Sequence, residues 1–505
     1  MVNPEIRSVV IAGGGTAGWM TAAALARVLG PRLSITLVES SEIGIVGVGE
    51  ATIPAIAQFN RLLKIDEDEF LRHTQGTFKL GIEFVDWFEK GQSYMHAFGP
   101  VGRDLAYVPF HQYFLRDQAA GTAGSLWDYS LNWLAAKQSR FARLERIPET
   151  PLAGLMWAFH FDASLYAAYL SRFAQALGVR RIDAKIAGAL QTADGDVRAL
   201  KLEDGRELAA DFFIDCTGFR GLLIEQTLKT GYDDWTAWLP CDRAQAVPSS
   251  STTPLTPYTR ATALEAGWQW RIPLQHRTGN GHVYSSAFTS DARASELLLA
   301  NLDAPALAEP RLIKFTTGRR KQLWNRNVVC MGLASGFLEP LESTSIHLIQ
   351  VTIQRLILLF PHAGNVEERR REFNRAASAE YDYIRDFIIL HYHANNRVGE
   401  PFWDACRNMS IPDSLRHRIE LFRESGGIHC ASDDLFQLTS WLQVLWGQGV
   451  KPQATHPFVE AVAAKDRAGY LEDLRRIIGH AAGTLPGHAD FIARHCAAAK
   501  TGNVI

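Results

Sequence analysis

The hydrophobic pattern at the start of the chain predicts a strand, a glycine turn and a helix. Residues 9–12 form a short apolar run rich in β-branched side chains, and residues 20–29 are dense in Ala and Leu, which favour helices. The turn at residues 13–19 reads GGGTAGW. A second apolar run, residues 34–38, predicts the next strand and ends at Glu39. This order is typical of a βαβ unit.

The glycine turn predicts a dinucleotide site. Gly13, Gly15 and Gly18 fit the G-x-G-x-x-G pattern in the strand–turn–helix context that gives it meaning. Glycines let the backbone and the helix N-terminus approach a pyrophosphate, whose charge the helix dipole favours. Glu39 follows Gly18 at about the 20-residue spacing of an acid that binds a ribose hydroxyl, which favours NAD or FAD over NADP. The alternative is a turn that only packs the βαβ unit.

The next segment predicts a loop, a helix and a strand. Residues 44–54 contain closely spaced glycines, which indicate backbone passing near a ligand, and we expect a loop over the cofactor. Residues 55–73 predict one helix by their apolar spacing. Residues 76–84 are aromatic and β-branched and predict one strand, in which Lys79 stands among apolar neighbours.

A later group of short strands narrows the choice of cofactor. Residues 163–177 predict a helix, and turn signals follow at 194–196 and 204–205. These lead to the sequence IDCTG at 214–218. A β-meander followed by such a strand is typical of flavoproteins with two dinucleotide folds, so the pattern favours FAD over NAD.

Aromatic residues gather in two regions that predict a substrate domain. Residues 88–150 are rich in Trp, Phe, Tyr and His with weak periodicity, and residues 267–284 predict a further sheet. Trp268, Trp270 and Ile272 share one face of a strand, because side chains alternate with a period of two. On the pattern alone, this face is an ordinary sheet core or a wall beside a ligand.

A candidate anion site lies before a predicted helix. A buried strand at 327–332 leads to a helix over 346–360, and Ser-Thr-Ser at 343–345 occupies the N-cap position. First-turn amides lack an intrahelical acceptor and can hold an anion. The alternative is ordinary capping by a hydroxyl.

The order of elements predicts an α/β (α+β) fold. We expect a two-dinucleotide-fold, glutathione-reductase-like FAD domain over 1–360, with an inserted substrate sheet at about 88–150 and 230–315. A helical subdomain is expected over 361–505. Its helices are predicted at 367–390, 412–425, 435–446 and 465–480.

Composition excludes several classes. The net charge is −2 with basic residues spread along the chain, so neither a nucleic-acid footprint nor a membrane surface is indicated. Six cysteines without a C-x-x-C pair predict free thiols rather than disulfides or a metal site. There is no signal-like N-terminus and no apolar run of about 18 residues. We therefore expect a cytoplasmic enzyme that binds no membrane and no metal.

Taken together, the motifs resemble the flavin-dependent halogenases of the tryptophan halogenase family. A glycine motif alone would be weak, but the combination is specific and spreads over most of the chain. It comprises GGGTAGW at 13–19, GVGEATIP at 47–54, Lys79, W-x-W-x-I-P at 268–273, FLEPLEST at 337–344 and RDFI at 385–388.

The resemblance implies a mechanism. A separate NAD(P)H-dependent flavin reductase supplies FADH2, and with O2 and chloride or bromide the flavin yields hypohalous acid. The acid travels through a tunnel to Lys79, which directs electrophilic halogen to an electron-rich ring. Glu342 accepts a proton from the ring carbon or orients the lysine, and the amides of Thr344 and Ser345 bind the halide. The face at 268–272 walls the flavin off from the substrate.

The resemblance also implies binding residues and one branch of the family. Ser345 stands where the family commonly has glycine, so it reshapes the halide pocket and would be strained if positive φ were required. The Tyr, Glu and Trp set that holds free tryptophan is missing at 435–449, which favours indole or a simple indole derivative. Phe110, His111 and Trp446 are candidates for stacking on the ring. The implied FAD contacts are Gly13, Gly15, Thr16, Ala17, Gly18, Glu39, Gly49, Ala51, Gly332 and Leu333.

Two other functions share parts of this pattern. An FAD-dependent aromatic hydroxylase would have the same fold but would need no halide. A flavin-binding protein without turnover would be indifferent to loss of Lys79. The oligomeric state stays open, with a homodimer compatible with the sequence.

Overall fold

The computed structural model describes residues 5–42, 49–105, 107–361 and 366–499 of the 505-residue chain. It divides into two compact units. The first comprises Met1–Gly76, Phe161–Pro240 and Lys314–Asp382, and the second comprises Thr77–His160, Cys241–Ile313 and Tyr383–Ile505. Within the described ranges, no helix is both long and apolar enough to cross a membrane.

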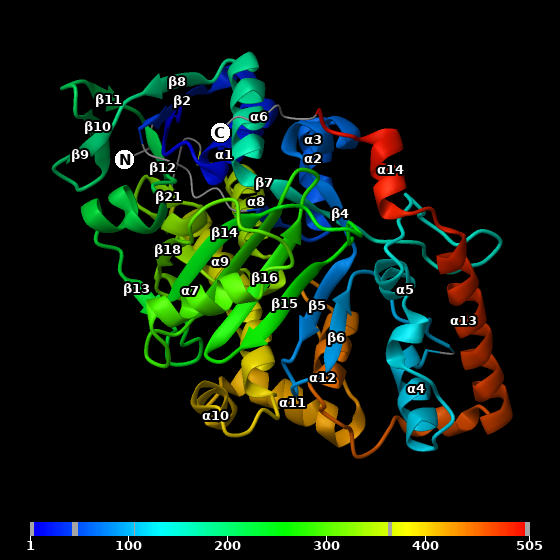
Figure 1. The fold of residues 1–505 in the computed structure, drawn as a ribbon. Helices are drawn as coiled ribbons and strands as arrows, with labels where there is room; N and C mark the ends of the chain where they lie inside the picture. Colours follow the sequence, from blue (N-terminus) through cyan, green and yellow to red (C-terminus); the bar gives the residue numbers. More distant parts are fainter. Residues whose placement is uncertain (1–4, 43–48, 106, 362–365, 500–505) are drawn as a thin grey trace. The chain divides into compact units, whose positions relative to one another are not determined.

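A six-stranded sheet forms the core of the first unit (Figure 1). Its strands are β1 (Ser8–Ala12), β2 (Ser34–Glu39), β8 (Arg180–Asp183), β12 (Phe212–Asp215), β20 (Trp324–Asn325) and β21 (Val328–Cys330). The order is β20-β21-β12-β1-β2-β8, and only β20 is antiparallel to its neighbour. Val9, Val10 and Ile11 are buried, as expected for a central parallel strand covered on both faces.

Helices and smaller sheets complete the first unit. Helix α1 contacts α6 and α8, and β9, β10 and β11 form the expected meander. The helices are α1 (Thr16–Leu29), α2 (Ala55–Leu63), α3 (Glu67–Thr74), α6 (Ala163–Ala176) and α8 (Ser345–Leu358). The remaining strands are β3 (Gly49–Ala51), β9 (Ile186–Gln191), β10 (Val197–Leu202), β11 (Glu207–Ala209), β13 (Tyr232–Asp234), β19 (Gly318–Arg320) and β22 (Gly336–Phe337).

The prediction of a single helix over 55–73 was wrong. Helix α2 ends at Leu63, because Lys64 adopts left-handed φ of 58°. Asp66 then caps α3 by accepting a hydrogen bond from the Glu69 amide. The helical spacing of apolar residues continues from α2 into α3 across the turn, so the sequence pattern did not reveal the break.

A seven-stranded sheet forms the core of the second unit. Its order is β18-β14-β17-β16-β15-β5-β6, with β15 and β5 parallel and the other pairs printed for it antiparallel. Its strands are β5 (Gly81–Val85), β6 (Ser93–Ala97), β14 (Arg243–Ser249), β15 (Thr259–Leu264), β16 (Gly267–Pro273), β17 (Thr278–Tyr284) and β18 (Arg311–Lys314). Figure 1 shows β16, β15, β5 and β6 side by side in this order.

The strand predicted over 76–84 is two strands. The first, β4 (Thr77–Lys79), pairs with β7 (Ala158–Asp162) so that Lys79 lies opposite Ala158. Leu80 separates it from β5 and donates its amide to Pro257 O at 2.7 Å. Lys79 is therefore the last residue of β4, which is not part of the seven-stranded sheet; the chain enters that sheet with β5.

The C-terminal part is helical, as predicted, but its helices do not form a unit of their own. From Tyr383 onward the chain belongs to the second unit, together with the inserted sheet. The domain boundaries expected at 360/361 stay a prediction, because the compact units follow other bounds. The helices of the C-terminal part are α9 (Glu367–His393), α10 (Pro401–Asn408), α11 (Asp413–Ser425), α12 (Leu438–Gly447), α13 (Ala464–Thr484) and α14 (His488–His495). Earlier in the chain, the second unit also contains α4 (Phe110–Ala119), α5 (Leu131–Lys137) and α7 (Asp291–Ala300).

Candidate functional site

At Gly13 and Gly18, backbone atoms approach the glycine turn of the first unit too closely for a side chain. Gly13 has φ of 106°, and a Cβ there would lie 2.3 Å from Cys216 O. A Cβ on Gly18 would lie 1.9 Å from Gly13 O. These contacts bring β1, β12 and the first turn of α1 close together, which is the role the pattern predicts for these glycines.

The space beside Gly15 is open. A Cβ on Gly15 would meet no atom within 4 Å, and its φ of −71° is accessible to any residue. Gly15 is the N-cap of α1, and no side chain caps this helix start. The amides of the first turn therefore face a space that a pyrophosphate fits.

Glu39 lies against the same turn. A Cβ on Gly14 would lie 1.7 Å from Glu39 Oε2. The carboxylate accepts hydrogen bonds from Trp19 Nε1 at 3.3 Å and from Arg181 Nε at 2.6 Å. These donors fix an acid at the end of β2, where a ribose-binding acid is expected, and its role toward the ribose stays a prediction.

Two further predicted cofactor residues touch each other. Gly332 has φ of 61°, and a Cβ there would lie 2.8 Å from the Cβ of Ala17 in α1. Leu333 follows Gly332 and is half-buried. The first unit thus has the narrow glycine-lined approach that a dinucleotide cofactor requires, and its residues fit FAD.

The glycine-rich loop is only partly described. Residues 43–48 lie outside the described part, whereas Gly49 and Ala51 are buried in β3. Between them, burial raises the pKa of Glu50 to about 7. A carboxyl that titrates near neutrality therefore stands in the loop predicted to cover the cofactor, and the sequence pattern did not single it out.

The candidate halide site is the start of α8. Thr344 is the N-cap and is fully buried, yet its side chain makes no capping hydrogen bond. Across the described ranges, no partner lies within hydrogen-bond reach of Thr344 Oγ1. Ser345 begins the helix and needs no positive φ; the left-handed residue is Ser343, with φ of 58°. The strain considered for Ser345 is therefore absent.

Glu342 directly precedes this helix start. It ends a short 3-10 helix, Pro340–Glu342, and is 1% exposed. Glu342 and the candidate halide site belong to the first unit, and Lys79 belongs to the second. Their roles relative to one another stay predictions.

Lys79 is fully buried in the second unit. Its side chain is 0% exposed, and its Nζ lies 5.2 Å from the centre of the Phe98 ring. Lysine side chains are rarely fully buried, so this burial makes Lys79 a candidate for a functional amine. Phe98 was missed by the sequence analysis, because it lies just after β6 (Ser93–Ala97) and no local pattern links it to Lys79.

Two buried histidines hold the strand that carries Lys79. His488 donates Nδ1–H to Leu255 O at 2.8 Å and accepts the amide of Phe78 on Nε2 at 3.2 Å. His160 contacts Thr77 Oγ1 at 3.0 Å, and this hydroxyl donates to Pro273 O at 2.7 Å. The His488 ring is therefore neutral, because Nε2 accepts from an amide while Nδ1 donates. His160 donates Nδ1–H to the Thr77 hydroxyl and contacts Thr259 Oγ1 through Nε2 at 2.9 Å.

The pKa values agree with neutral rings. Burial lowers the pKa of His488 to about 4. The pKa of His160 lies well below its usual value, mainly through burial and next through the positive charge of Lys79. Both effects oppose a second positive charge near the lysine.

A pH dependence follows for His488. Its pKa is lowered in the folded state, so its contribution to stability is present above pH 6.5 and is lost as pH falls towards about 4. We expect the free energy of unfolding to fall by about 2 kcal/mol between pH 7 and 5 through this group alone. Urea unfolding of the wild type and of His488→Gln should show the smaller pH dependence in the variant. The exposed His417→Gln is the control, and equal pH dependence in all three proteins would contradict the assignment.

The tryptophan face of β16 is part of a packed sheet. Every residue of β16 is buried, so both faces of the strand are covered. The Trp268 ring lies 6.2 Å from Trp87, and Trp270 packs over Gly281, where a Cβ would approach within 2.0 Å. The face at Trp268, Trp270 and Ile272 is therefore part of a sheet core, as one of the two alternatives expected. Its role as a wall beside the flavin stays a prediction.

The three candidates for stacking on the substrate ring are packed in the second unit. Phe110 lies 5.0 Å from Tyr129, and His111 Nε2 donates to Gly426 O at 2.8 Å. Burial lowers the pKa of His111. Trp446 is half-buried with Lys451 Nζ 3.3 Å from its ring centre. Their stacking on a substrate therefore stays a prediction, whereas Phe98 is the ring beside Lys79.

Comparisons with known proteins establish the family. The model of the tryptophan halogenase family matches residues 8–464. The flavin-dependent halogenase Xcc4156 from Xanthomonas campestris is 48% identical, with a TM-score of 0.95, over 99% of this chain and 100% of that chain. BrvH from Brevundimonas sp. BAL3, also a flavin-dependent halogenase, is 45% identical, with a TM-score of 0.93, over 97% of this chain and 100% of that chain.

A curated relative extends the comparison. The tryptophan 6-halogenase SttH from Streptomyces toxytricini is 33% identical over 523 aligned positions, covering 97% of this chain and 98% of its own length. These likenesses confirm both the resemblance drawn from the motifs and the α/β fold of an FAD-binding flavoprotein. The chain is an enzyme and belongs to the tryptophan halogenase family of flavin-dependent halogenases.

Proposed function

We propose that the enzyme uses FADH2, O2 and chloride or bromide to halogenate an electron-rich aromatic compound, namely indole or an indole derivative. The observation that carries this proposal is the complete burial of Lys79 beside the Phe98 ring. A fully buried lysine does not act as an ordinary surface charge. Its amine can hold an electrophile by hydrogen bonding or, when unprotonated, react with it.

FAD would be held by the glycine turn, Glu39 and Gly332 of the first unit. Bound in reduced form, FAD would supply the two electrons that convert one oxygen atom of O2 into water, while the other oxygen atom oxidises the halide to hypohalous acid. The amides before α8 and the Thr344 hydroxyl would hold the halide, since a helix N-terminus favours an anion.

Lys79 would hold hypohalous acid by hydrogen bonding, or as the free amine would take up the halogen. Glu342 would accept the proton that the ring carbon loses, or orient the lysine. The neutral rings of His160 and His488 support these roles, because they hold β4 without adding positive charge beside the amine.

The substrate class rests on the relatives and on what this chain lacks. SttH is a tryptophan 6-halogenase and KtzQ from Kutzneria sp. is a tryptophan 7-halogenase. Residues 435–449 offer Phe436, Trp441 and Trp446 but no Glu, so the complete set for free tryptophan is missing and indoles without an amino acid group are preferred. A separate flavin reductase supplies the reduced cofactor.

Halide dependence tests the proposal. A panel of indoles with a flavin reductase, NADH and either bromide or chloride should give halogenated products with the matching isotope pattern in mass spectrometry. Thr344→Val should raise the halide concentration for half-maximal rate about tenfold, since a hydroxyl donor to an anion is lost.

Thr352→Val is the matched control, because Thr352 lies on the same helix and donates to Leu348 O. Hydroxylated products that form without halide would replace the proposal by an aromatic hydroxylase. An unchanged halide requirement in Thr344→Val would remove the hydroxyl from the halide site.

A further inference from the structure

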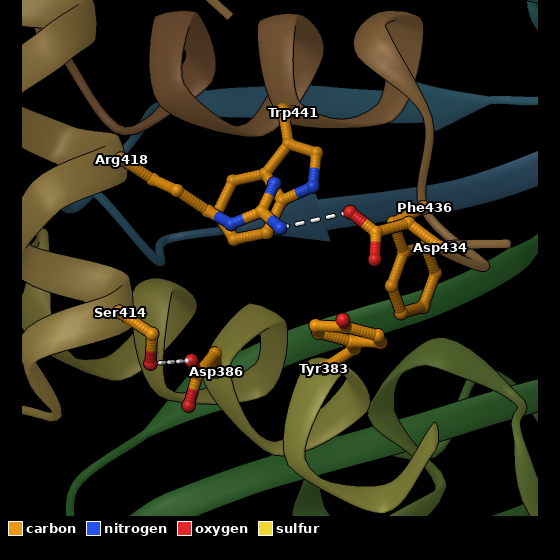
Figure 2. A pocket seen from close by; sticks show the side chains of 7 residues that line it. All are labelled: Tyr383, Asp386, Ser414, Arg418, Asp434, Phe436 and Trp441. Carbon is orange, nitrogen blue, oxygen red and sulfur yellow. Dashed lines mark hydrogen bonds and ion pairs between the residues drawn. The ribbon is translucent and has the colours of Figure 1, made fainter. Parts of the chain in front are cut away.

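A small cavity of the second unit holds one buried acceptor without a partner. Asp434 Oδ2 accepts a hydrogen bond from Arg418 at 2.8 Å, whereas its Oδ1 has no partner in the described part of the chain. The cavity has a volume of about 30 Å³, which admits a water that would supply the missing donor. It therefore points to no further ligand. Figure 2 shows its lining, which consists of Tyr383, Asp386, Ser414, Arg418, Asp434, Phe436 and Trp441.

The start of α8 in the first unit holds three such groups in a row. Thr344, His347 and Gln350 are 0%, 6% and 6% exposed. The atoms that lack a hydrogen-bond partner among the described residues are Thr344 Oγ1, His347 Nδ1 and Gln350 Nε2. Residues three apart are neighbours on a helix surface, so these groups form one polar row that begins at the candidate halide site. Buried polar atoms without partners are costly, and a ligand that satisfies them is stabilising.

Glu380 fixes the His347 ring within this row. His347 Nε2 lies 2.9 Å from Glu380 Oε1, and both side chains are largely buried. A carboxylate oxygen only accepts, so Nε2 carries a proton and Nδ1 is the nitrogen that can take up another. Helical side chains lean towards the N-terminus of their helix. The ring therefore lies over the turn that begins at Thr344, with Nδ1 on the side nearer the backbone.

Charge also favours a proton at this place. Glu339 and Glu342, which precede α8, are 0% and 1% exposed, so a halide at the helix start enters beside two acidic residues. Positive charge that arrives with the halide stabilises it there. An imidazolium at His347 would direct one N–H to Glu380 and the other to the anion, which satisfies both nitrogens. The arginines on α8 and on the helices that contact it are Arg355, 3.7 Å from Glu380, and Arg27 and Arg61 in the last turns of α1 and α2.

We propose that halide binds at the start of α8 together with one proton, which His347 carries on Nδ1 and donates as a hydrogen bond to the halide. This inference rests on the proposed function and deepens it, because it makes His347, oriented by Glu380, the proton-bearing member of the halide site. The overall conversion FADH2 + O2 + X⁻ + H⁺ → FAD + H2O + HOX consumes one proton with each halide. A site that takes up both therefore supplies them in the ratio that the product needs.

Halide and proton binding to the FAD-loaded protein, without reductase or substrate, test the inference. In weakly buffered solution at neutral pH, sodium chloride should cause uptake of up to about one proton per chain, reported by a pH indicator. Sodium gluconate at equal ionic strength should cause none. The Kd for chloride, measured by line broadening of the chloride NMR signal, should rise by up to about tenfold for each pH unit above neutrality.

Two variants probe the pair of His347 and Glu380. His347→Gln keeps a donor for Glu380 but has no titratable ring, so it should lose the proton uptake and bind chloride independently of pH. Glu380→Gln should keep the coupling but move it to lower pH by about one unit or more, since no carboxylate stabilises the imidazolium. A merely structural role would leave the pH profile in place. Thermal unfolding of the FAD-loaded variants checks that they are folded.

His73→Gln is the matched control. His73 Nε2 lies 3.9 Å from Glu69 Oε1 in the same unit, but this pair is about half exposed, so the variant should behave as the wild type. Glu50 must be separated from His347, because its pKa is about 7. Glu50→Gln should retain the proton uptake. Loss of the uptake in Glu50→Gln with retention in His347→Gln would assign the proton to Glu50 and overturn the inference.

The outcomes distinguish this inference from the proposed function. Chloride binding to the wild type that does not change with pH overturns the proton-coupled site, while halogenation of the indole panel would leave the proposed function standing. Coupled uptake in a protein that halogenates no indole supports the site and contradicts only the proposed function. A wild type that binds no chloride overturns the inference together with the halide site at α8.

Discussion

Lys79→Ala is expected to abolish the halogenated product while FAD binding survives. The substitution changes none of the predicted FAD contacts, so we expect the cofactor to bind as in the wild type. A group that holds or relays the reacting species contributes about 10² to 10⁴ in rate, and product formation should fall by at least about a hundredfold. The measurements are product by mass spectrometry and FAD affinity by fluorescence titration.

Two further variants serve as controls for the Lys79→Ala result. Lys79→Met fills the buried space without an amine, so it distinguishes loss of the amine from loss of packing. Lys90→Ala removes a lysine whose side chain is 67% exposed and should leave the activity unchanged. Retained halogenation in Lys79→Ala would remove Lys79 from the mechanism, whereas loss of FAD binding would show that the substitution disturbs more than the relay.

The dinucleotide turn could be predicted because its causes are local. A Cβ on Gly18 would meet Gly13 of the same turn and a Cβ on Gly14 would meet Glu39 at the end of the next strand, and glycine spacing reports such close approaches directly. The helix start at residues 343–345 is local in the same sense, although the sequence could not show that Thr344 leaves its hydroxyl without a partner.

The surroundings of Lys79 could not be predicted in this way. The amide of Phe78 bonds to His488, 410 residues later in the chain, and no local pattern links them. The break at Leu80 was hidden because apolar residues continue from β4 into β5. The resemblance to the family singled out Lys79, but its ring neighbour Phe98 required the fold.

Asp434 shows the same limit on a smaller scale. Its neighbours Arg418 and Ser414 come from α11 and Asp386 comes from α9, so the sequence separates groups that line one cavity. From the sequence alone, an acidic residue beside aromatic residues would be taken as solvent-exposed. Only the structure shows that Asp434 is buried. Function in this chain therefore lies in contacts between distant segments that the local patterns support but do not specify.

Gly15→Ala is expected to weaken FAD binding strongly without weakening the fold. Nothing lies within 4 Å of the added Cβ and the φ of −71° suits alanine, so the flavin-free protein should unfold at the same or a slightly higher temperature. The methyl group would occupy space that a pyrophosphate needs, and FAD affinity should fall at least about tenfold. Thermal unfolding and fluorescence titration measure the two effects separately.

Comparison with two other glycines makes the result decisive. Gly188→Ala is the control, because Gly188 lies in β9 of the same unit with equally open space, and both properties should stay unchanged. Gly13→Ala should lower both stability and FAD affinity, since its Cβ meets backbone at 2.3 Å. If Gly15→Ala bound FAD normally, the turn would serve only to pack the βαβ unit, and the cofactor would have to approach the protein elsewhere.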